Sequence, residues 1–279
     1  MTGKQDRVTR WLYETAPGRV LLPLLIRPAV SRFGGWCLDR RVSCLLIRPF
    51  VRSSSIRLKD YPRRPYRSFN DFFTRTILPE KRPVDRRPDV LAAPCDGKLT
   101  VYTITENKRF RIKGVEYTLE QLLRDTELAG RFNGGSLLLF RLSVSDYHRY
   151  IWNLDGIPGE SARIPGVYHT VHPTAAASKA IYRENTREYV VEHTEDFGDV
   201  LIMEVGAMLV GRIENHPMPD KVFRGQEKGF FSYGGSTILL LLEPGRVTMA
   251  QKLLDRSRNE LETPVKMGQA IGRLQSKPV

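Results

Sequence analysis

Two serines of this chain follow a pair of glycines and precede an aliphatic run. Ser136 lies in GGSLLLF and Ser236 in GGSTILLLLE, and Pro244 and Gly245 close the second run. A serine hydroxyl attacks as a nucleophile when a neighbouring base accepts its proton. The same pattern is also typical of a buried strand that is entered from a tight turn. The local sequence therefore leaves open, for both serines, whether the hydroxyl reacts or only begins a strand.

Histidine, the usual base for such a serine, occurs only five times. His148 follows an apolar run within RLSVSDYHRYIW, and His169 and His172 lie three residues apart in YHTVHP. A carboxylate is available at Asp96 in APCDGKL, although Asp-Gly is also an ordinary turn sequence. Each of these residues taken alone favours a structural role. A catalytic role would have to come from their combination.

Metal sites and disulfides are not expected. His169 and His172 stand in an extended segment bounded by proline, where this spacing does not bring two imidazoles together, and no nearby Cys or carboxylate completes a site. The three cysteines, Cys37, Cys44 and Cys95, have neither an even count nor paired spacing. They predict a reducing compartment and no disulfide framework.

Positive charge is concentrated in the first third of the chain. The formal net charge is +13; residues 1–87 carry 20 Lys and Arg against 7 Asp and Glu, whereas residues 88–279 carry 24 of each sign. The same third contains WLYETAPGRVLLPLLIRPAV and CLLIRPFV, in which aliphatic blocks alternate with arginine. Its longest apolar run, residues 20–26, is far shorter than the roughly 20 residues that span a bilayer. Short apolar faces flanked by arginine suit helices that lie in an anionic membrane interface.

Two other interpretations of this basic region remain open. A nucleic-acid surface would interleave its basic residues with stacking aromatics, whereas here they are interleaved mainly with aliphatics. A helical subdomain that only packs its apolar face on the core is the other interpretation. We expect an anionic membrane surface as the partner, and no nucleic acid.

The two parts of the chain differ in their predicted secondary structure. Residues 1–60 predict short helices separated by prolines, and in the basic connection that follows Ser68 is expected to cap a helical turn that carries three phenylalanines. One further helix is expected over residues 118–132. From residue 90 onward, apolar segments between glycines and prolines predict strands over residues 98–104, 110–118, 135–143, 188–194, 199–213 and 236–243.

These elements predict an α+β protein with two parts. Residues 1–85 form a basic, amphipathic, membrane-associating helical region and linker. Residues 86–279 form a β-rich catalytic core of the barrel or sandwich kind. The boundary is placed where the composition changes, near residue 85.

The chain resembles the phosphatidylserine decarboxylase family in seven segments that follow in this order: SFNDFFTRTILPEKRPVD, APCDGKL, DYHRY, HTVHP, FGDVLIMEVGAMLVGRI, VFRGQEKGFFSYGGST and VKMGQAIG. The resemblance extends back through WLYETAPGR, so it covers nearly the whole chain. Its most specific part is RGQEKGFFSYGGST, and it is most similar to a bacterial branch of the family.

The resemblance implies a proenzyme that cleaves itself between Gly235 and Ser236. The products would be a β chain of residues 1–235 and an α chain of residues 236–279, which remain together as a heterodimer, and a higher oligomer is compatible with this. Ser236 would become an N-terminal pyruvoyl group, the covalent cofactor of the family. The glycines before it lack side chains that would hinder attack on the Gly235 carbonyl. Ser136 matches no such site.

Asp96 and His148 match the residues that would activate the serine, so the resemblance implies a triad of Asp96, His148 and Ser236. The pyruvoyl carbonyl would form a Schiff base with the amine of phosphatidylserine and accept the electrons released with CO2, which gives phosphatidylethanolamine. His148 is also the candidate acid that returns a proton. The expected location is the cytoplasmic side of the cell membrane, with peripheral attachment.

One position departs from the family pattern. Many relatives carry a second histidine three residues after the first, where this chain has Ile151. Either His148 serves both self-cleavage and decarboxylation, or His169 supplies the missing imidazole. We predict His148 as the base of the triad and His169 as a supporting or proton-transfer residue, and we expect structural roles for the other three histidines.

Two alternatives of different kinds stay open. A pyruvoyl enzyme could act on another amino acid or on another lipid with a serine headgroup, and a homologue that has lost self-cleavage would only bind membranes. The membrane-directed first third disfavours a free amino acid as substrate. The joint presence of Ser236, Asp96 and His148 disfavours a non-catalytic protein.

Overall fold

The computed structural model describes residues 2–54, 56–208, 212–232 and 236–275, with side chains described from Asp6 onward. Helices account for most of the first 73 residues: α1 (Thr2–Glu14), α2 (Ala16–Leu25), α3 (Pro28–Leu38), the 3₁₀ turn η1 (Arg41–Leu46), α4 (Ile47–Ser53), η2 (Leu58–Asp60) and α5 (Phe69–Phe73). The later helices are short: η3 (Pro79–Lys81), α6 (Leu119–Leu123), α7 (Thr126–Arg131), α8 (Pro173–Ser178), α9 (Ile181–Glu184) and α10 (Gln251–Arg258).

Strands form the rest of the chain. In chain order they are β1 (Val90–Ala92), β2 (Gly97–Thr103), β3 (Arg109–Ile112), β4 (Val115–Thr118), β5 (Ser136–Leu142), β6 (Arg149–Ile151), β7 (Ile157–Pro158), β8 (Ala162–Ile164), β9 (Arg187–Thr194), β10 (Gly198–Val205), β11 (Ile213–Asn215), β12 (Glu227–Phe231), β13 (Ser236–Leu242), β14 (Val247–Met249), β15 (Thr263–Val265) and β16 (Ala270–Leu274). The α+β class with a β-rich core is therefore confirmed.

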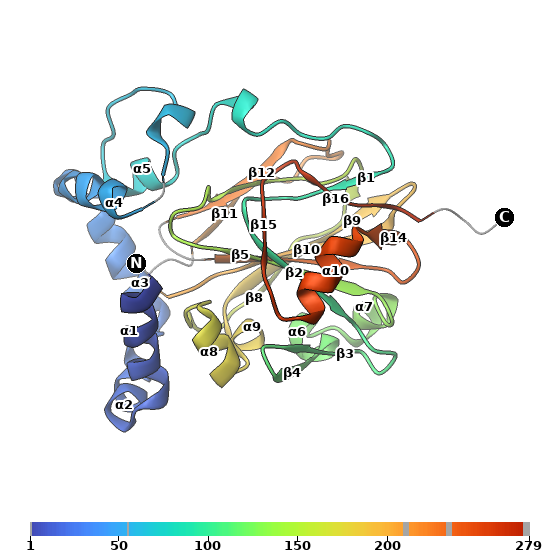
Figure 1. Cartoon of the computed structure of the whole chain (residues 1–279), viewed down its shortest axis with the longest axis horizontal. Helices are drawn as coiled ribbons and strands as arrows, with labels where there is room; N and C mark the ends of the chain where they lie inside the picture. The colour runs from blue at the N-terminus through green and yellow to red at the C-terminus, as the bar shows by residue number, and fades with distance from the viewer. Residues whose placement is uncertain (1, 55, 209–211, 233–235, 276–279) are drawn as a thin grey trace.

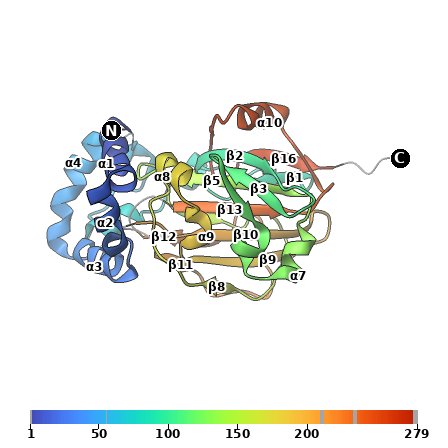
Figure 2. The same ribbon diagram turned by 90° about the horizontal axis from the view of Figure 1, so that it is seen from below.

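A central antiparallel sheet organises the molecule. Its strands lie in the order β15-β2-β5-β13-β10-β9-β7, and β8 pairs with β9 outside this path. Figure 2 shows β2, β5, β13, β10 and β9 in succession across the body. Three smaller sheets accompany it, in the orders β1-β16-β14, β11-β12-β6 and β3-β4.

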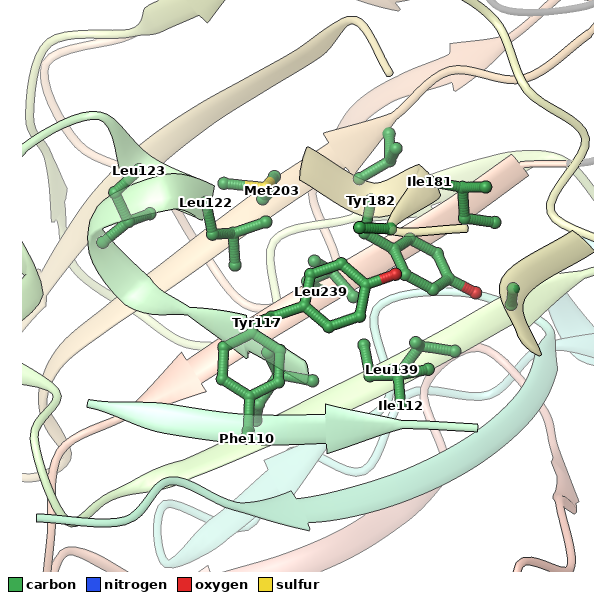
Figure 3. Packing of buried hydrophobic residues seen from close by; sticks show 14 of the residues in the cluster. Phe110, Ile112, Tyr117, Leu122, Leu123, Leu139, Ile181, Tyr182, Met203 and Leu239 are labelled. Carbon is green, nitrogen blue, oxygen red and sulfur yellow. The ribbon is translucent and has the colours of Figure 1, made fainter. Parts of the chain in front are cut away.

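The central sheet has an apolar core on each face, because side chains alternate along every strand. One face packs against helices α6, α8 and α9 and the β3–β4 hairpin, where Tyr117 and Tyr182 lie beside Leu139 and Leu239 of the sheet (Figure 3). The other face packs against the two three-stranded sheets through residues such as Tyr150, and we call it the sandwich core. Both layers bury strand residues almost completely, so β13 is covered on both sides.

The amino-terminal helices gather at one end of the molecule (Figures 1 and 2). Leu12, Tyr13 and Leu22 of α1 and α2 are buried in the same cluster as the helix-covered face of the sheet. The remaining faces of these helices are largely exposed. The division into two parts near residue 85 stays a prediction, since this first part contributes to the core of the second.

Local predictions were right where one short-range interaction decides the structure. Ser68 caps α5, because its hydroxyl accepts a hydrogen bond from the Asp71 N–H at 3.1 Å. The single helix expected over residues 118–132 is wrong: the chain turns through a left-handed residue, Arg124 (φ 54°), and Asp125 caps a new helix, α7.

Two strand predictions are also corrected. The segment 110–118 is a hairpin that turns at Lys113 (φ 50°) and Gly114 (φ 83°) rather than one strand. The segment 199–213 is not continuous, since β10 ends at Val205 and Ile213 begins β11 in a different sheet. Residues 209–211 of that segment lie outside the described residues.

A carboxyl group is buried in the sandwich core. Glu192 of β9 is 0% exposed, and neither of its carboxylate oxygens has a hydrogen-bond partner in the described part of the chain. Burial raises the pKa of Glu192 to about 8, and the nearby negative charge of Asp155 adds to this. The folded protein therefore holds this side chain as a neutral acid over much of the range in which an exposed glutamate is ionised.

The free energy of unfolding should reflect this buried acid. Between pH 4.5, the unfolded-state pKa, and about pH 8, the folded-state pKa, Glu192 is protonated in the folded chain and ionised in the unfolded chain. The free energy of unfolding therefore falls as the pH rises through this window. Relative to Glu192→Gln, the protein should lose up to about 1.4 kcal/mol per pH unit across this window. Urea unfolding at several pH values measures the difference, with both chains carrying Ser236→Ala so that each stays in one piece. A difference that is independent of pH would contradict the assignment.

Candidate functional site

Three neighbouring interior strands begin or end at the same end of the central sheet, which we call its edge. β2 begins at Gly97, β5 ends at Leu142 and β13 begins at Ser236, and these strands are neighbours. Leu142 of β5 pairs with Ser236 of β13. Arg141, the preceding residue of β5, pairs with Lys98 of β2. Antiparallel pairing thus brings the segments that carry Asp96, His148 and Ser236 to the same edge.

The Ser236 hydroxyl is the most unusual group at this edge. The residue is 0% exposed, and its Oγ has no hydrogen-bond partner within the described ranges. Its side chain lies on the sandwich-core face of β13 with Ile238 and Leu240. Leu239 and Leu241, which alternate with them, face the helices. A buried hydroxyl without a partner costs about 1–3 kcal/mol, and the hydroxyl of Thr237, the next residue of β13, is buried in the same way. Gly235 lies outside the described residues, so the predicted cleavage bond is placed only on its Ser236 side.

His148 is buried next to α5 and to the strand that precedes residues 233–235. Its Nδ1 lies 2.9 Å from the carbonyl oxygen of Asp146, and a carbonyl only accepts, so Nδ1 carries the proton. In the neutral ring the basic lone pair is then on Nε2. The Phe73 ring packs 4.4 Å from the imidazole, and the Phe231 N–H donates to the His148 carbonyl at 2.9 Å. These contacts fix the tautomer and the position of a potential base.

Asp96 is held at the start of β2 by two cations. The Arg82 guanidinium donates from Nε to Oδ1 at 2.7 Å and from Nη2 to Oδ2 at 2.5 Å, and Lys266 Nζ lies 3.1 Å from Oδ2. The Met267 N–H adds a hydrogen bond of 2.9 Å to Oδ1. Such bidentate, charge-assisted bonds fix the orientation of a carboxylate. The described hydrogen bonds of Asp96 thus go to these three residues, and its pairing with His148 stays a prediction.

Several acidic groups surround Cys95, which precedes Asp96 and is fully buried. Burial raises the pKa of the Cys95 thiol, and the negative charges of Asp96, Asp146 and Glu204 raise it further. Burial likewise raises the pKa of Asp146, with a contribution from Asp96. Carboxyl groups from three separate segments therefore share one electrostatic environment around Cys95.

His169 lies in a hydrogen-bond network between α1 and the end of β10. Its Nε2 is 3.0 Å from a Glu184 carboxylate oxygen, and its Nδ1 is 2.9 Å from the Tyr13 hydroxyl. Asn185 binds both the N–H and the carbonyl of His169 and also donates to the carbonyl of Gly206 at 2.8 Å. Gly206 follows Val205, the partner of the residue after Ser236, so the network reaches the same edge of the sheet. Both ring nitrogens are engaged, and a role of His169 in proton transfer stays a prediction.

No group of three or more His, Cys, Asp or Glu side chains in the described part of the chain is arranged to hold a metal ion. Two of the remaining histidines form exposed pairs, His193 with Asp199 and His216 with Glu227, each at 2.7 Å. The Nδ1 of His172 accepts a long hydrogen bond of 3.4 Å from the Thr174 N–H that follows it.

Comparison with known proteins identifies the family. A family model described as phosphatidylserine decarboxylase matches residues 69–273. "Phosphatidylserine decarboxylase proenzyme 2" of Clostridium acetobutylicum is 41% identical over 94% of this chain and 90% of its own length. The "phosphatidylserine decarboxylase proenzyme" sequences of Clostridium kluyveri and of Chlamydia caviae are each 38% identical, over 96% of this chain and 92% of theirs. The chain belongs to the phosphatidylserine decarboxylase family.

The part that matches the phosphatidylserine decarboxylase family contains charged residues that sequence reasoning did not single out. Arg82 and Lys266 lie in the family-like segments ending EKRPVD and beginning VKMGQ, yet only the folded chain shows that both bind Asp96. Glu204 and Lys228 form a buried pair with 2.8 Å between Nζ and Oε1. A charged residue within the apolar run VLIMEV was the available signal for Glu204.

Asp96→Asn should destabilise the folded chain by about 3 kcal/mol, because it leaves the guanidinium of Arg82 and the ammonium of Lys266 without their carboxylate. Asp89→Asn is the matched control: its partner Arg273 lies 3.3 Å away with both side chains exposed, so the loss should stay below about 1 kcal/mol. Chemical unfolding of both variants in a Ser236→Ala background gives the comparison. Equal losses for the two variants would be inconsistent with the buried Asp96 cluster.

Proposed function

We propose that this chain is a self-cleaving phosphatidylserine decarboxylase proenzyme, a carboxy-lyase that converts phosphatidylserine into phosphatidylethanolamine and CO2. The observation that supports it most directly is the buried Ser236 hydroxyl, which has no hydrogen-bond partner among the described residues, at the edge where the segments of Asp96 and His148 meet. Cleavage between Gly235 and Ser236 gives a β chain of residues 1–235 and an α chain of residues 236–279. The two chains remain together as a heterodimer.

In this proposal His148 moves protons at Ser236. Its Nε2 takes the hydroxyl proton as the oxygen attacks, and the Nδ1 bond to Asp146 keeps the ring in the tautomer that this requires. Asp96, which Arg82 and Lys266 hold in place, supplies the negative charge that stabilises the imidazolium. His169 remains the alternative imidazole for the second reaction.

The pyruvoyl group derived from Ser236 supplies a carbonyl conjugated with an amide, which accepts the electrons that remain when CO2 leaves. The surroundings of Ser236 fit such a group, since the position is buried against Leu142 of β5 and lies at the start of a strand that is apolar on both faces. Exclusion of water from this edge protects a reactive carbonyl. His148 returns a proton to the carbon that loses CO2.

Self-cleavage can be tested by the intact mass of the purified protein beside a Ser236→Ala variant. The expected result is two fragments from the parent, divided between Gly235 and Ser236 with a blocked amino terminus on the smaller, and one whole chain from the variant. The cut protein should then release CO2 from phosphatidylserine vesicles and not from soluble serine. A parent chain that stays whole would leave the proposal without its cofactor and favour a non-catalytic membrane-binding homologue.

The amino-terminal helices provide the proposed membrane surface. Eleven of the fifteen exposed large apolar side chains described lie within residues 8–58, where positive charge also predominates. Phe33 and Trp36 of α3 stack at 6.0 Å and are 67% and 54% exposed, and the Arg40 guanidinium lies over the Trp36 ring. No helix in the described ranges is both long and apolar enough to span a bilayer. We propose that these helices lie in the interface of an anionic membrane, on the cytoplasmic side.

Replacing Phe33 and Trp36 together by serine should lower partitioning onto phosphatidylserine vesicles at least about 10-fold, because each side chain contributes roughly 1.5–3 kcal/mol when it leaves water. Ile157→Ser, which removes a 60% exposed side chain from the catalytic part, should leave partitioning unchanged. Vesicle sedimentation at low and high salt measures both effects. Equal binding by the two variants would argue against this surface.

A further inference from the structure

A second ionisable side chain faces Ser236 from the neighbouring strand. Glu204 belongs to β10, which pairs with β13, and it is 0% exposed. Its register partner on β13 is Ile238, two residues from Ser236. Because side chains alternate, Ser236, Ile238 and Glu204 all point to the sandwich-core face. Glu204 and Ser236 are therefore diagonal neighbours, a separation that a glutamate side chain can span.

The Ser236 Oγ at this diagonal lacks a hydrogen bond in the described part of the chain. Glu204 Oε1 has Lys228 Nζ at 2.8 Å as its ion-pair partner, and a carboxylate oxygen can accept a second hydrogen bond. A hydroxyl needs an acceptor, and a carboxylate oxygen is an acceptor. The Glu204 carboxylate is thus an acceptor on the same face of the sheet as the Ser236 hydroxyl.

The surroundings of Glu204 make its carboxylate more basic than that of an exposed glutamate. Lys228 supplies the opposite charge, and Asn215 donates from Nδ2 to Oε2 at 3.3 Å. Burial raises the pKa of Glu204, and the negative charge of Glu188, its register partner on β9, acts in the same direction. The thiol of Cys95 and the phenol of Tyr150 also feel this charge. A carboxylate held in this way accepts a proton more readily than an exposed one.

We propose that Glu204 is a second proton acceptor for the Ser236 hydroxyl in self-cleavage, alongside His148. The inference rests on the proposed function. The buried Glu204–Lys228 pair then has a chemical role at Ser236 besides linking β10 to β12.

The proposed step conserves atoms and charge. The Ser236 O–H bond breaks, its electron pair forms a bond to the carbonyl carbon of the preceding residue, and Glu204 holds the proton as a carboxylic acid. As the C–N bond of that peptide breaks, the proton passes to the departing nitrogen. The product is an ester with a free amine on Ser236, and Glu204 is a carboxylate again. No oxidant or further reactant is needed.

Glu204→Gln tests the step because it keeps the shape of the side chain and removes its basicity. The full chain, made by cell-free synthesis and followed over time by intact mass, should cleave about 10²–10⁴-fold more slowly than the parent. Glu192→Gln is the matched control: this carboxyl is equally buried on the same face, but its register partner Val200 lies at the other end of β10, so cleavage should proceed at the parent rate.

The pH dependence separates a chemical role from a structural one. Cleavage of the parent should accelerate as pH rises and Glu204 ionises, whereas Glu204→Gln should lose this dependence. Lys228→Met leaves Glu204 in place without its countercharge, so the rise should move to higher pH, which gives a second measurement if the Gln variant does not fold. Parent-like cleavage by Glu204→Gln would overturn the inference and leave the proposed function intact. A parent that never cleaves would overturn both.

Discussion

The pairing of β13 with β5 on one side and with β10 on the other is the constraint on which the site depends. It sets Ser236 opposite Leu142 and places Glu204 on the next diagonal. Side chains alternate with a period of two, so a slip of one residue would turn Ser236 from the sandwich core to the helix-covered face. Seven register pairs with β5 and six with β10 align β13 in this way. The position of the Ser236 hydroxyl is thus set mainly by aliphatic strand residues that take no part in a reaction.

Two of the buried carboxyl groups at this edge are matched by nearby cations. Asp96 is matched by Arg82 and Lys266, and Glu204 by Lys228. Removing one member of such a pair destabilises the fold more than replacing both members by apolar residues, because the remaining charge stays buried. The cations come from segments far apart in the chain, so the edge also ties the connection before β1 and the loop before β16 to the sheet. The contacts that order the site are therefore also contacts that hold distant parts of the fold together.

The sequence predicted the class of the fold, because motifs and strand patterns are short-range signals, whereas the roles of Asp96, His148 and Ser236 stay predictions. Ser68 as a cap and the aliphatic strand that begins at Ser236 are examples. It could not predict that Arg124 adopts a left-handed conformation and divides the expected helix, since that depends on how Leu122 and Leu123 pack. Partners that meet only across the sheet, such as Glu204 with Lys228, carry no local signature. Nor does the bond between His169 and Tyr13, which joins residues 156 positions apart.

The position of β13 in the middle of the sheet has a consequence for a chain that is cut before it. Both neighbours of β13 precede residue 236, while β15 and β16 after it pair with β2 and β1 from before it. The carboxy-terminal segment is therefore interwoven with the rest of the molecule, and it could leave only if several ladders of backbone hydrogen bonds opened together. Two cleaved molecules would not exchange their carboxy-terminal fragments while folded. Each would keep the fragment with which it was synthesised.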